Sequence, residues 1–342
     1  MNPTPRAFVT NAEDGTVSTF SVAPDGGLVR LAVSPVGKGC GTLVVDAARQ
    51  QVHVGIKGEP AAIVTMAIEA DGALREVGRR EVPDAVHYLV LTPDGSTLLA
   101  ASYGGGFGAS MPVTAAGVGE IASRVEHPNV HSCAVSADGR TAYFVSLGAD
   151  LIAQCALREG RLEPLGSPTV AAPEGSGPRH IVLNRANDAA YVMTEFSGEV
   201  LHYERAESGE LTLRGVHPAY DPDAGLSHSR MGADPAAEHL IWGADIHLAA
   251  DESVLWASER CASTLATLPL GADGVPGEVR QFVPTPKQPR GFGVSPDGGV
   301  VLCTGEKATE VESYVVSPTD GTLASVARAE TGRGANWVRF LG

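Results

Sequence analysis

The most restrictive feature of this sequence is a strand–turn–strand pattern that recurs along the whole chain. Its most visible element is an Asp-Gly pair, which occurs eight times, at Asp14, Asp25, Asp71, Asp94, Asp138, Asp273, Asp297 and Asp320. Asp-Gly between apolar segments favours a β-hairpin, because both residues tolerate the positive φ angles that tight turns need. The pattern therefore predicts many short antiparallel strands.

Alignment of these strands gives seven similar units. Their equivalent strands begin near Arg6, Gln51, Thr97, Thr141, Ala189, Val254 and Val300. Most successive starts are about 45 residues apart, which is the length of a four-stranded propeller blade. We assign the longer gap before the sixth unit to an enlarged loop over residues 217–240.

The two ends of the chain complement each other. Residues 336–340 look like a first strand with no unit after it, and residues 6–10 look like a second strand with no first strand before it. Pairing them would close a ring and remove two exposed sheet edges. We predict an all-β fold, a single seven-bladed β-propeller domain over residues 1–342, with four-stranded blades. The C-terminal strand would pair with the N-terminal strand to close the ring.

Composition and charge exclude several classes of protein. No apolar run approaches the roughly 18 residues of a membrane-spanning helix, and residues 1–6 lack a basic-then-apolar leader. The formal net charge of −15 disfavours binding to nucleic acid. Five scattered cysteines without a Cys-x-x-Cys pair disfavour a disulfide scaffold and suit a reducing compartment. We expect a cytoplasmic protein, monomeric or weakly homo-oligomeric, with no nucleic-acid or membrane partner.

A propeller gathers equivalent positions of its blades at one mouth of the channel, so we compared these positions between units. The first column lies seven residues before the turn Asp or its equivalent and contains His87, His131, Arg179 and Arg290. The second column lies just past the second strand and contains Lys57, Tyr103, Leu147, Glu195, Arg260 and Glu306. Ionisable side chains dominate both columns, which predicts either a polar site at the mouth or a structural ring of ion pairs.

Searches for other chemical motifs are negative. The sequence has no Gly-x-Ser-x-Gly elbow, no Gly-Lys-Ser/Thr phosphate loop and no His-Glu-x-x-His metal motif. Four glycines, at 104, 105, 106 and 108, follow an expected strand, but no helix follows them. They indicate a close-packed turn, because a dinucleotide loop needs a βαβ unit.

Two segments resemble the signature of a known family. Residues 175–181 read Gly-Ser-Gly-Pro-Arg-His-Ile, and residues 190–195 read Ala-Tyr-Val-Met-Thr-Glu. They are similar to the Gly-x-Gly-Pro-Arg-His … Tyr-Val-x-x-Glu pattern of the lactonase family of seven-bladed propellers. That family includes 6-phosphogluconolactonases and the fungal carboxy-cis,cis-muconate cyclase. Further matches, in the family's order, lie at residues 103–106, 130–132, 245–247, 257–260 and 289–292.

The resemblance to the cyclase branch of this family implies a catalytic set of one histidine, two arginines and one glutamate. By motif these are His131, Arg179, Arg260 and Glu195, and the column comparison selects the same four. The expected substrate-binding residues are Lys57, His87, Tyr103, His180, His247, Arg290 and Glu306. No metal and no organic cofactor is implied. Ser146 departs from the family pattern, in which an aspartate is common at that position.

The leading hypothesis is hydrolysis of an anionic sugar lactone, namely 6-phospho-D-glucono-1,5-lactone, to 6-phosphogluconate. Either Glu195 or His131 would act as general base, and Arg179 and Arg260 would bind the oxyanion or the phosphate. Two alternatives are a lactonising cyclase of the carboxymuconate type and a non-catalytic propeller that binds a ligand or a protein.

A second cationic pair is available for the phosphate group itself. Arg290 and Lys57 belong to the two columns and carry the charge that a phosphate requires. We therefore expect a cationic mouth on a protein whose overall charge is strongly negative, against which an anionic substrate must approach.

Overall fold

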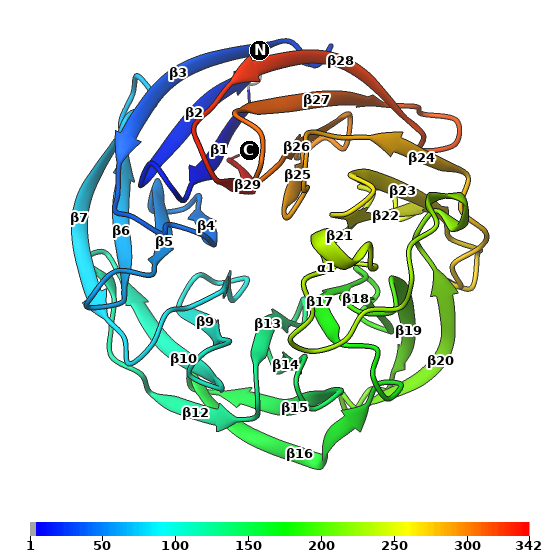
Figure 1. Ribbon diagram of the computed structural model, residues 1–342. Helices are drawn as coiled ribbons and strands as arrows, with labels where there is room; N and C mark the ends of the chain where they lie inside the picture. Colours follow the sequence, from blue (N-terminus) through cyan, green and yellow to red (C-terminus); the bar gives the residue numbers. More distant parts are fainter. Residues whose placement is uncertain (1–4, 342) are drawn as a thin grey trace.

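The computed structural model describes residues 5–341 and contains seven β-sheets, arranged as blades in a closed ring (Figure 1). All seven predicted strand starts coincide with the first residues of strands in the structure. The fold prediction is therefore confirmed. The single-domain interpretation of residues 1–342 stays a prediction, and residues 1–4 and 342 lie outside the described part.

Within each blade the strands follow one another from the axis to the rim. Blade 1 consists of β29 (Ala335–Leu341), β1 (Arg6–Asn11), β2 (Thr16–Val22) and β3 (Leu28–Pro35). Blade 2 consists of β4 (Leu43–Asp46), β5 (Gln51–Ile56), β6 (Ala62–Ile68) and β7 (Leu74–Glu81). Blade 3 consists of β8 (Tyr88–Leu91), β9 (Thr97–Ser102), β10 (Phe107–Thr114), β11 (Gly117–Val118) and β12 (Ser123–Glu126).

The remaining four blades are regular and four-stranded. Blade 4 consists of β13 (Val130–Val135), β14 (Thr141–Ser146), β15 (Leu151–Arg158) and β16 (Arg161–Ala171). Blade 5 consists of β17 (Pro178–Leu183), β18 (Ala189–Thr194), β19 (Glu199–Arg205) and β20 (Leu211–Pro218). Blade 6 consists of β21 (Gly243–Leu248), β22 (Val254–Glu259), β23 (Thr264–Pro269) and β24 (Gln281–Pro284). Blade 7 consists of β25 (Phe292–Val294), β26 (Val300–Thr304), β27 (Glu310–Val316) and β28 (Leu323–Glu330).

Blade 3 departs from the four-stranded prediction, because two short strands share its outer position. Strand β11 pairs with the end of β10 near Val113, and β12 pairs with its beginning, from Phe107 to Ser110. The chain turns sharply at Gly117, which has a φ of 107°. Residues 119–122 belong to no strand, although the amides of Gly119 and Ala122 still donate to β10, and β12 then continues along the same edge.

The ring closes as the chain ends predict. Strand β29 pairs with β1 in antiparallel register, with Phe8 opposite Arg339 and Thr10 opposite Trp337. The indole nitrogen of Trp337 also donates to the carbonyl of Leu43 in blade 2, at 3.1 Å. The last strand therefore completes blade 1 and also bonds to blade 2.

The predicted turn chemistry and the apolar strand interiors together explain the packing. The glycine of each of the eight Asp-Gly pairs has a positive φ, between 66° and 90°. Buried apolar side chains form clusters between adjacent blades, for example between Tyr143 of blade 4 and Tyr203 of blade 5. Sheets that face each other in this way fix the angle between neighbours and therefore the positions of the strand ends.

The enlarged loop between blades 5 and 6 contains the only helices of the described residues. They are a 3₁₀ turn, η1 (Pro222–Ala224), and a single α-helical turn, α1 (Pro235–Glu238), capped by Asp234. In the view along the ring, α1 is drawn beside the inner strand of blade 6 (Figure 1). No helix in residues 5–341 is long and apolar enough to cross a membrane.

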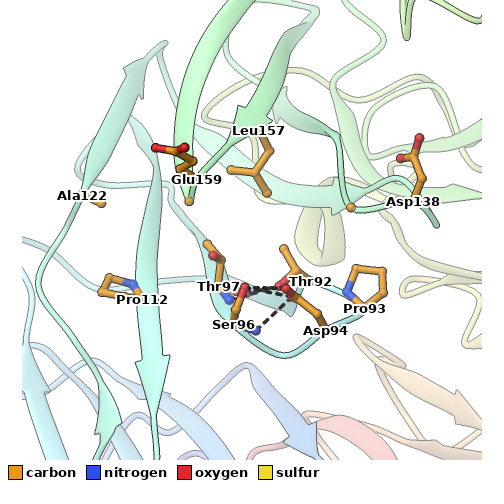
Figure 2. A pocket seen from close by; sticks show the side chains of 12 residues that line it. Thr92, Pro93, Asp94, Ser96, Thr97, Pro112, Ala122, Asp138, Leu157 and Glu159 are labelled. Carbon is orange, nitrogen blue, oxygen red and sulfur yellow. Dashed lines mark hydrogen bonds between the residues drawn. The ribbon is translucent and has the colours of Figure 1, made fainter.

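A surface cavity of about 460 Å³ lies between blades 3 and 4, around the turns that join their first and second strands (Figure 2). Its polar groups bond to each other: Asp94 accepts hydrogen bonds from the Thr92 hydroxyl at 2.6 Å and from the Ser96 amide at 3.0 Å. The Asp94 turn follows β8, whereas His87 precedes it. The cavity is therefore at the opposite end of the blades from the predicted site.

Candidate functional site

Two of the four candidates in the first column, His131 and Arg179, lie at β-bulges at the beginnings of inner strands. In blade 4, Val130 pairs with Ser146 and Ser132 with Val145, so His131 is the extra residue. In blade 5, the same irregularity leaves Arg179 as the extra residue. A bulge changes the direction of one side chain without breaking the sheet. In blades 4 and 5 the bulge therefore sets the direction of the His131 and Arg179 side chains.

The two columns meet as pairs of residues sixteen apart. Arg179 Nε donates to Glu195 Oε2 at 2.8 Å, and Arg290 Nη1 donates to Glu306 Oε1 at 3.1 Å. In blade 3, the backbone amide of Tyr103 donates to His87 Nδ1 at 3.3 Å. The two columns form four such pairs, and these three are in direct contact; the fourth pair is His131 with Leu147.

Glu195 lies between arginines from two blades. Its Oε2 accepts a hydrogen bond from Arg179 and is also 2.9 Å from Arg260 Nη2. Arg260 is held by Trp242, whose ring faces the guanidinium carbon at 3.8 Å. The side chains of Arg179 and Arg260 are 0% and 2% exposed, whereas that of Glu195 is 18% exposed. The carboxylate is therefore the part of this triad that meets solvent.

The arginines determine the charge of Glu195. Burial acts to raise the pKa of this carboxyl, but Arg260 and Arg179 outweigh burial and lower the pKa below its usual value of 4.5. Glu195 is consequently ionised at neutral pH and keeps Oε1 available to another partner.

His87 and His131 are neutral at neutral pH. Burial, followed by Lys57 and Arg290, lowers the pKa of His87 to about 3. Burial and Arg179 lower the pKa of His131 well below its usual range. The His131 ring lies 5.8 Å from that of Tyr103, and its Nδ1 is buried without a hydrogen-bond partner. These residues form an aromatic wall beside the arginine–glutamate triad.

His180 lies behind Arg179, whereas the side chain of His247 is 19% exposed. His180 is 1% exposed, and its Nε2 is 3.0 Å from Arg179 Nη1. Its Nδ1 is 2.7 Å from Asp245 Oδ1, and His247 Nε2 is 3.2 Å from Asp245 Oδ2. The site candidates chosen from the sequence omit Asp245, although the Asp-Ile-His segment was noted as a family match.

A second charged group lies at the same mouth. It consists of Lys57 and the Arg290–Glu306 pair. The surroundings of the Lys57 amine remove part of its water, and this desolvation and Arg290 lower its pKa. With Arg179, Arg260 and Glu195, the mouth has four cationic side chains and two carboxylates. Two further carboxylates, Asp245 and Glu259, are buried close to Arg179 and Arg260.

The enlarged loop approaches the site from the side of blade 5. The amide of Ser229 donates to the carbonyl of Phe196, the residue after Glu195, at 3.0 Å. Met231 reaches Tyr103 of blade 3, with 3.6 Å between its sulfur and the phenol oxygen. The loop therefore connects blade 5 to blade 3 beside the mouth. Among residues 5–341, no group of three or more His, Cys, Asp or Glu side chains is arranged to hold a metal ion.

Comparison with known proteins agrees with this geometry. The family model "Lactonase, 7-bladed beta-propeller" matches residues 6–340. A 6-phosphogluconolactonase of Cronobacter sakazakii is 27% identical over 337 residues, which cover 97% of this chain and 96% of the relative. One of Serratia proteamaculans is 27% identical over 341 residues and covers 98% of both chains.

Solved structures give the same fold. The periplasmic gluconolactonase of Pseudomonas aeruginosa superimposes with a TM-score of 0.87 at 21% identity, covering 99% of both chains. This likeness concerns the fold, and the cytoplasmic location expected for the present chain stays a prediction. The family match over nearly the whole length identifies the chain as a member of the lactonase family of seven-bladed β-propellers and as a lactonase.

Proposed function

We propose that this lactonase hydrolyses 6-phospho-D-glucono-1,5-lactone to 6-phosphogluconate at the mouth where Glu195, Arg179 and Arg260 meet. The observation that carries the proposal is the carboxylate of Glu195, which is ionised and partly exposed between two buried guanidiniums. Relatives named 6-phosphogluconolactonase along the whole chain support the choice of substrate.

Glu195 is the general base of the proposed reaction. A base must come within hydrogen-bond distance of the attacking water. Of the four catalytic candidates, Glu195 has the most exposed side chain, whereas His131 is 4% exposed as a residue. The lowered pKa of Glu195 makes this carboxylate a weaker base but keeps it deprotonated at every pH near neutrality.

The two arginines make the proton transfer favourable. As the water oxygen bonds to the lactone carbonyl carbon, its proton passes to Glu195 Oε1 and the carbonyl oxygen becomes an oxyanion. The negative charge thereby moves from Glu195 to the substrate beside it, and both charges face the same two guanidiniums. Fixed positive charges that stabilise a developing oxyanion are a major source of catalytic rate enhancement.

Collapse of the tetrahedral intermediate completes the reaction. The bond between the carbonyl carbon and the ring oxygen breaks, and Glu195 returns its proton to that oxygen. The new carboxylic acid then ionises in water. Every proton is accounted for by water, Glu195 and the product, so His131 can remain neutral throughout and orient the substrate.

Lys57 and Arg290 are the proposed phosphate contacts. Both belong to the second charged group, and the side chain of Arg290 is 23% exposed. Guanidinium and ammonium groups suit phosphate oxygens, so these two side chains can attract the phosphate group to a protein whose net charge is negative. Glu306 holds Arg290 in place.

Freshly prepared lactone tests the proposal directly. The purified chain should release acid faster than the uncatalysed background, and phosphorylated lactone should have a lower KM than glucono-1,5-lactone. Glu195→Gln and Arg260→Ala should each reduce kcat by about 100-fold or more. Wild-type rates in both variants would refute the site. Turnover of a carboxymuconate, followed by ultraviolet absorbance, would instead favour the cyclase alternative.

A further inference from the structure

Asp245 is a buried carboxylate with all four of its bonding positions occupied. Its Oδ1 contacts His180 Nδ1 at 2.7 Å and accepts from the Ile246 amide at 3.0 Å. Its Oδ2 contacts His247 Nε2 at 3.2 Å and accepts from the Phe292 amide, also at 3.2 Å. The residue is 1% exposed and connects blades 5, 6 and 7.

These contacts determine which nitrogen of His180 carries the proton. A carboxylate only accepts hydrogen bonds, so the ring nitrogen that faces it must be the N–H donor. His180 therefore donates from Nδ1 to Asp245, which leaves a lone pair on Nε2. Arg179 Nη1, which can only donate, is 3.0 Å from that lone pair.

The same chain of contacts continues to the proposed base. Arg179 Nη1 also donates to the carbonyl of Ala244 at 2.7 Å, so two acceptors fix one end of the guanidinium. The Nε of Arg179 then donates to Glu195 at 2.8 Å. Asp245, His180, Arg179 and Glu195 thus form a directed series in which each member fixes the next.

We propose that Asp245 is a positioning residue of the lactonase site, which holds Glu195 in its reactive position through His180 and Arg179. It does not touch the substrate. With the other tautomer, His180 would direct an N–H at the Arg179 N–H groups, and the guanidinium would lose its place beside Glu195. This inference rests on the proposed role of Glu195.

The first test concerns the wild-type protein and needs no variant. Nitrogen-15 NMR of labelled histidines distinguishes an imidazole protonated on Nδ1 from one protonated on Nε2. The signals of His180 are assigned by their loss in His180→Asn. We expect His180 to be neutral and protonated on Nδ1 at pH 7. A proton on Nε2 would overturn the inference, whatever the enzyme hydrolyses.

The second test uses two substitutions of Asp245. Asp245→Ala leaves His180 without an acceptor, and we expect kcat to fall about tenfold or more with little change in KM, the scale of losing a group that orients a reacting one. Asp245→Asn can still present a carbonyl oxygen to His180 Nδ1, so it should recover part of that loss. A kcat within twofold of wild type in Asp245→Ala, or no recovery in Asp245→Asn, would overturn the inference.

Asp46 provides a matched control. It is 3% exposed, its Oδ2 lies 3.9 Å from the buried imidazole of His53, and it belongs to blade 2, away from the mouth. Asp46→Ala should lower stability and leave kcat unchanged. An equal loss of kcat in both alanine variants would mean a merely structural role for Asp245. If the wild-type chain hydrolyses no lactone, the proposed function fails, whereas the NMR result still decides the tautomer.

Discussion

Replacement of Glu195 by glutamine changes one oxygen to an NH₂ group and should separate chemistry from folding. In the wild type, a single carboxylate oxygen lies 2.8 Å from Arg179 Nε and 2.9 Å from Arg260 Nη2. Glutamine keeps the shape and one acceptor oxygen, but it removes the negative charge that both guanidiniums face. It also removes the proposed base.

Two magnitudes follow from this geometry. Loss of a general base costs about 10²- to 10⁴-fold in rate, so we expect kcat to fall by at least about 100-fold. Leaving buried guanidiniums without their carboxylate costs about 3–5 kcal/mol. Because Glu195 is 18% exposed, water compensates in part, and we expect about 3 kcal/mol less stability.

Acid release in a pH-stat measures kcat, and urea unfolding measures stability. Glu312→Gln is the matched control, because Glu312 is 2% exposed and contacts Arg328 at 3.2 Å in the outer half of blade 7. The control should lose stability and keep kcat. If Glu195→Gln lost stability but retained wild-type kcat, Glu195 would be only a structural partner of the arginines and the mechanism would be wrong.

The pH profile gives an independent check on the same residue. Since the folded-state pKa of Glu195 is lowered, its ionised form persists below pH 4.5, and kcat/KM of the wild type should decline only below that pH. The stability that Glu195 contributes is present above the unfolded-state pKa and is lost as the pH falls through the lower, folded-state pKa. A decline of kcat/KM centred near pH 6.5 would contradict Glu195 as the base, because the pKa of Glu195 lies below 4.5.

Three further predictions concern the phosphate, the core and the histidines. Lys57→Met should raise KM about tenfold for the phosphorylated lactone and leave KM for glucono-1,5-lactone unchanged, as initial rates will show. Tyr143→Phe should cost about 2 kcal/mol in urea unfolding without affecting kcat, because Arg205 Nε, buried 2.7 Å from the phenol oxygen, loses its acceptor. The unfolding free energy should also decrease as the pH falls from 6.5 towards 4, by up to about 1.4 kcal/mol per pH unit for each histidine with a folded pKa of about 3 or 4. These are His53, His87 and His180. A stability that stays flat over this range would contradict their neutral burial.

Much of the architecture could be predicted because it repeats. The seven second strands begin where the aligned units place them, and the sixteen-residue step between columns brings Arg179 to Glu195 and Arg290 to Glu306. Equivalent positions of successive repeats lie at the same end of neighbouring blades. A comparison between units therefore predicts which residues lie close together before any contact is known. The split outer edge of blade 3 escaped prediction because it is a local event, set by the turn at Gly117, that no other unit shares.

Asp245 escaped the same comparison for a geometric reason. In blade 6 the first-column position, sixteen residues before Arg260, is occupied by Ala244, whose contribution is a backbone carbonyl rather than a side chain. The next residue along the chain, Asp245, has the carboxylate, which is buried. Its importance depends on contacts with His180 of blade 5 and Phe292 of blade 7, which no spacing along the chain encodes.

The ring can close only late in synthesis, because its two closing strands lie at opposite ends of the sequence. Strand β1 is made first, yet its inner partner, β29, follows every other strand, and the bonded side chains of Thr10 and Asn336 are 326 residues apart. At about 5–20 residues per second, translation leaves β1 without that partner for some tens of seconds. During this interval the nascent chain exposes a sheet edge that could join a neighbouring ribosome's product. The inner edge of β1 can be completed within the chain only after β29 has emerged.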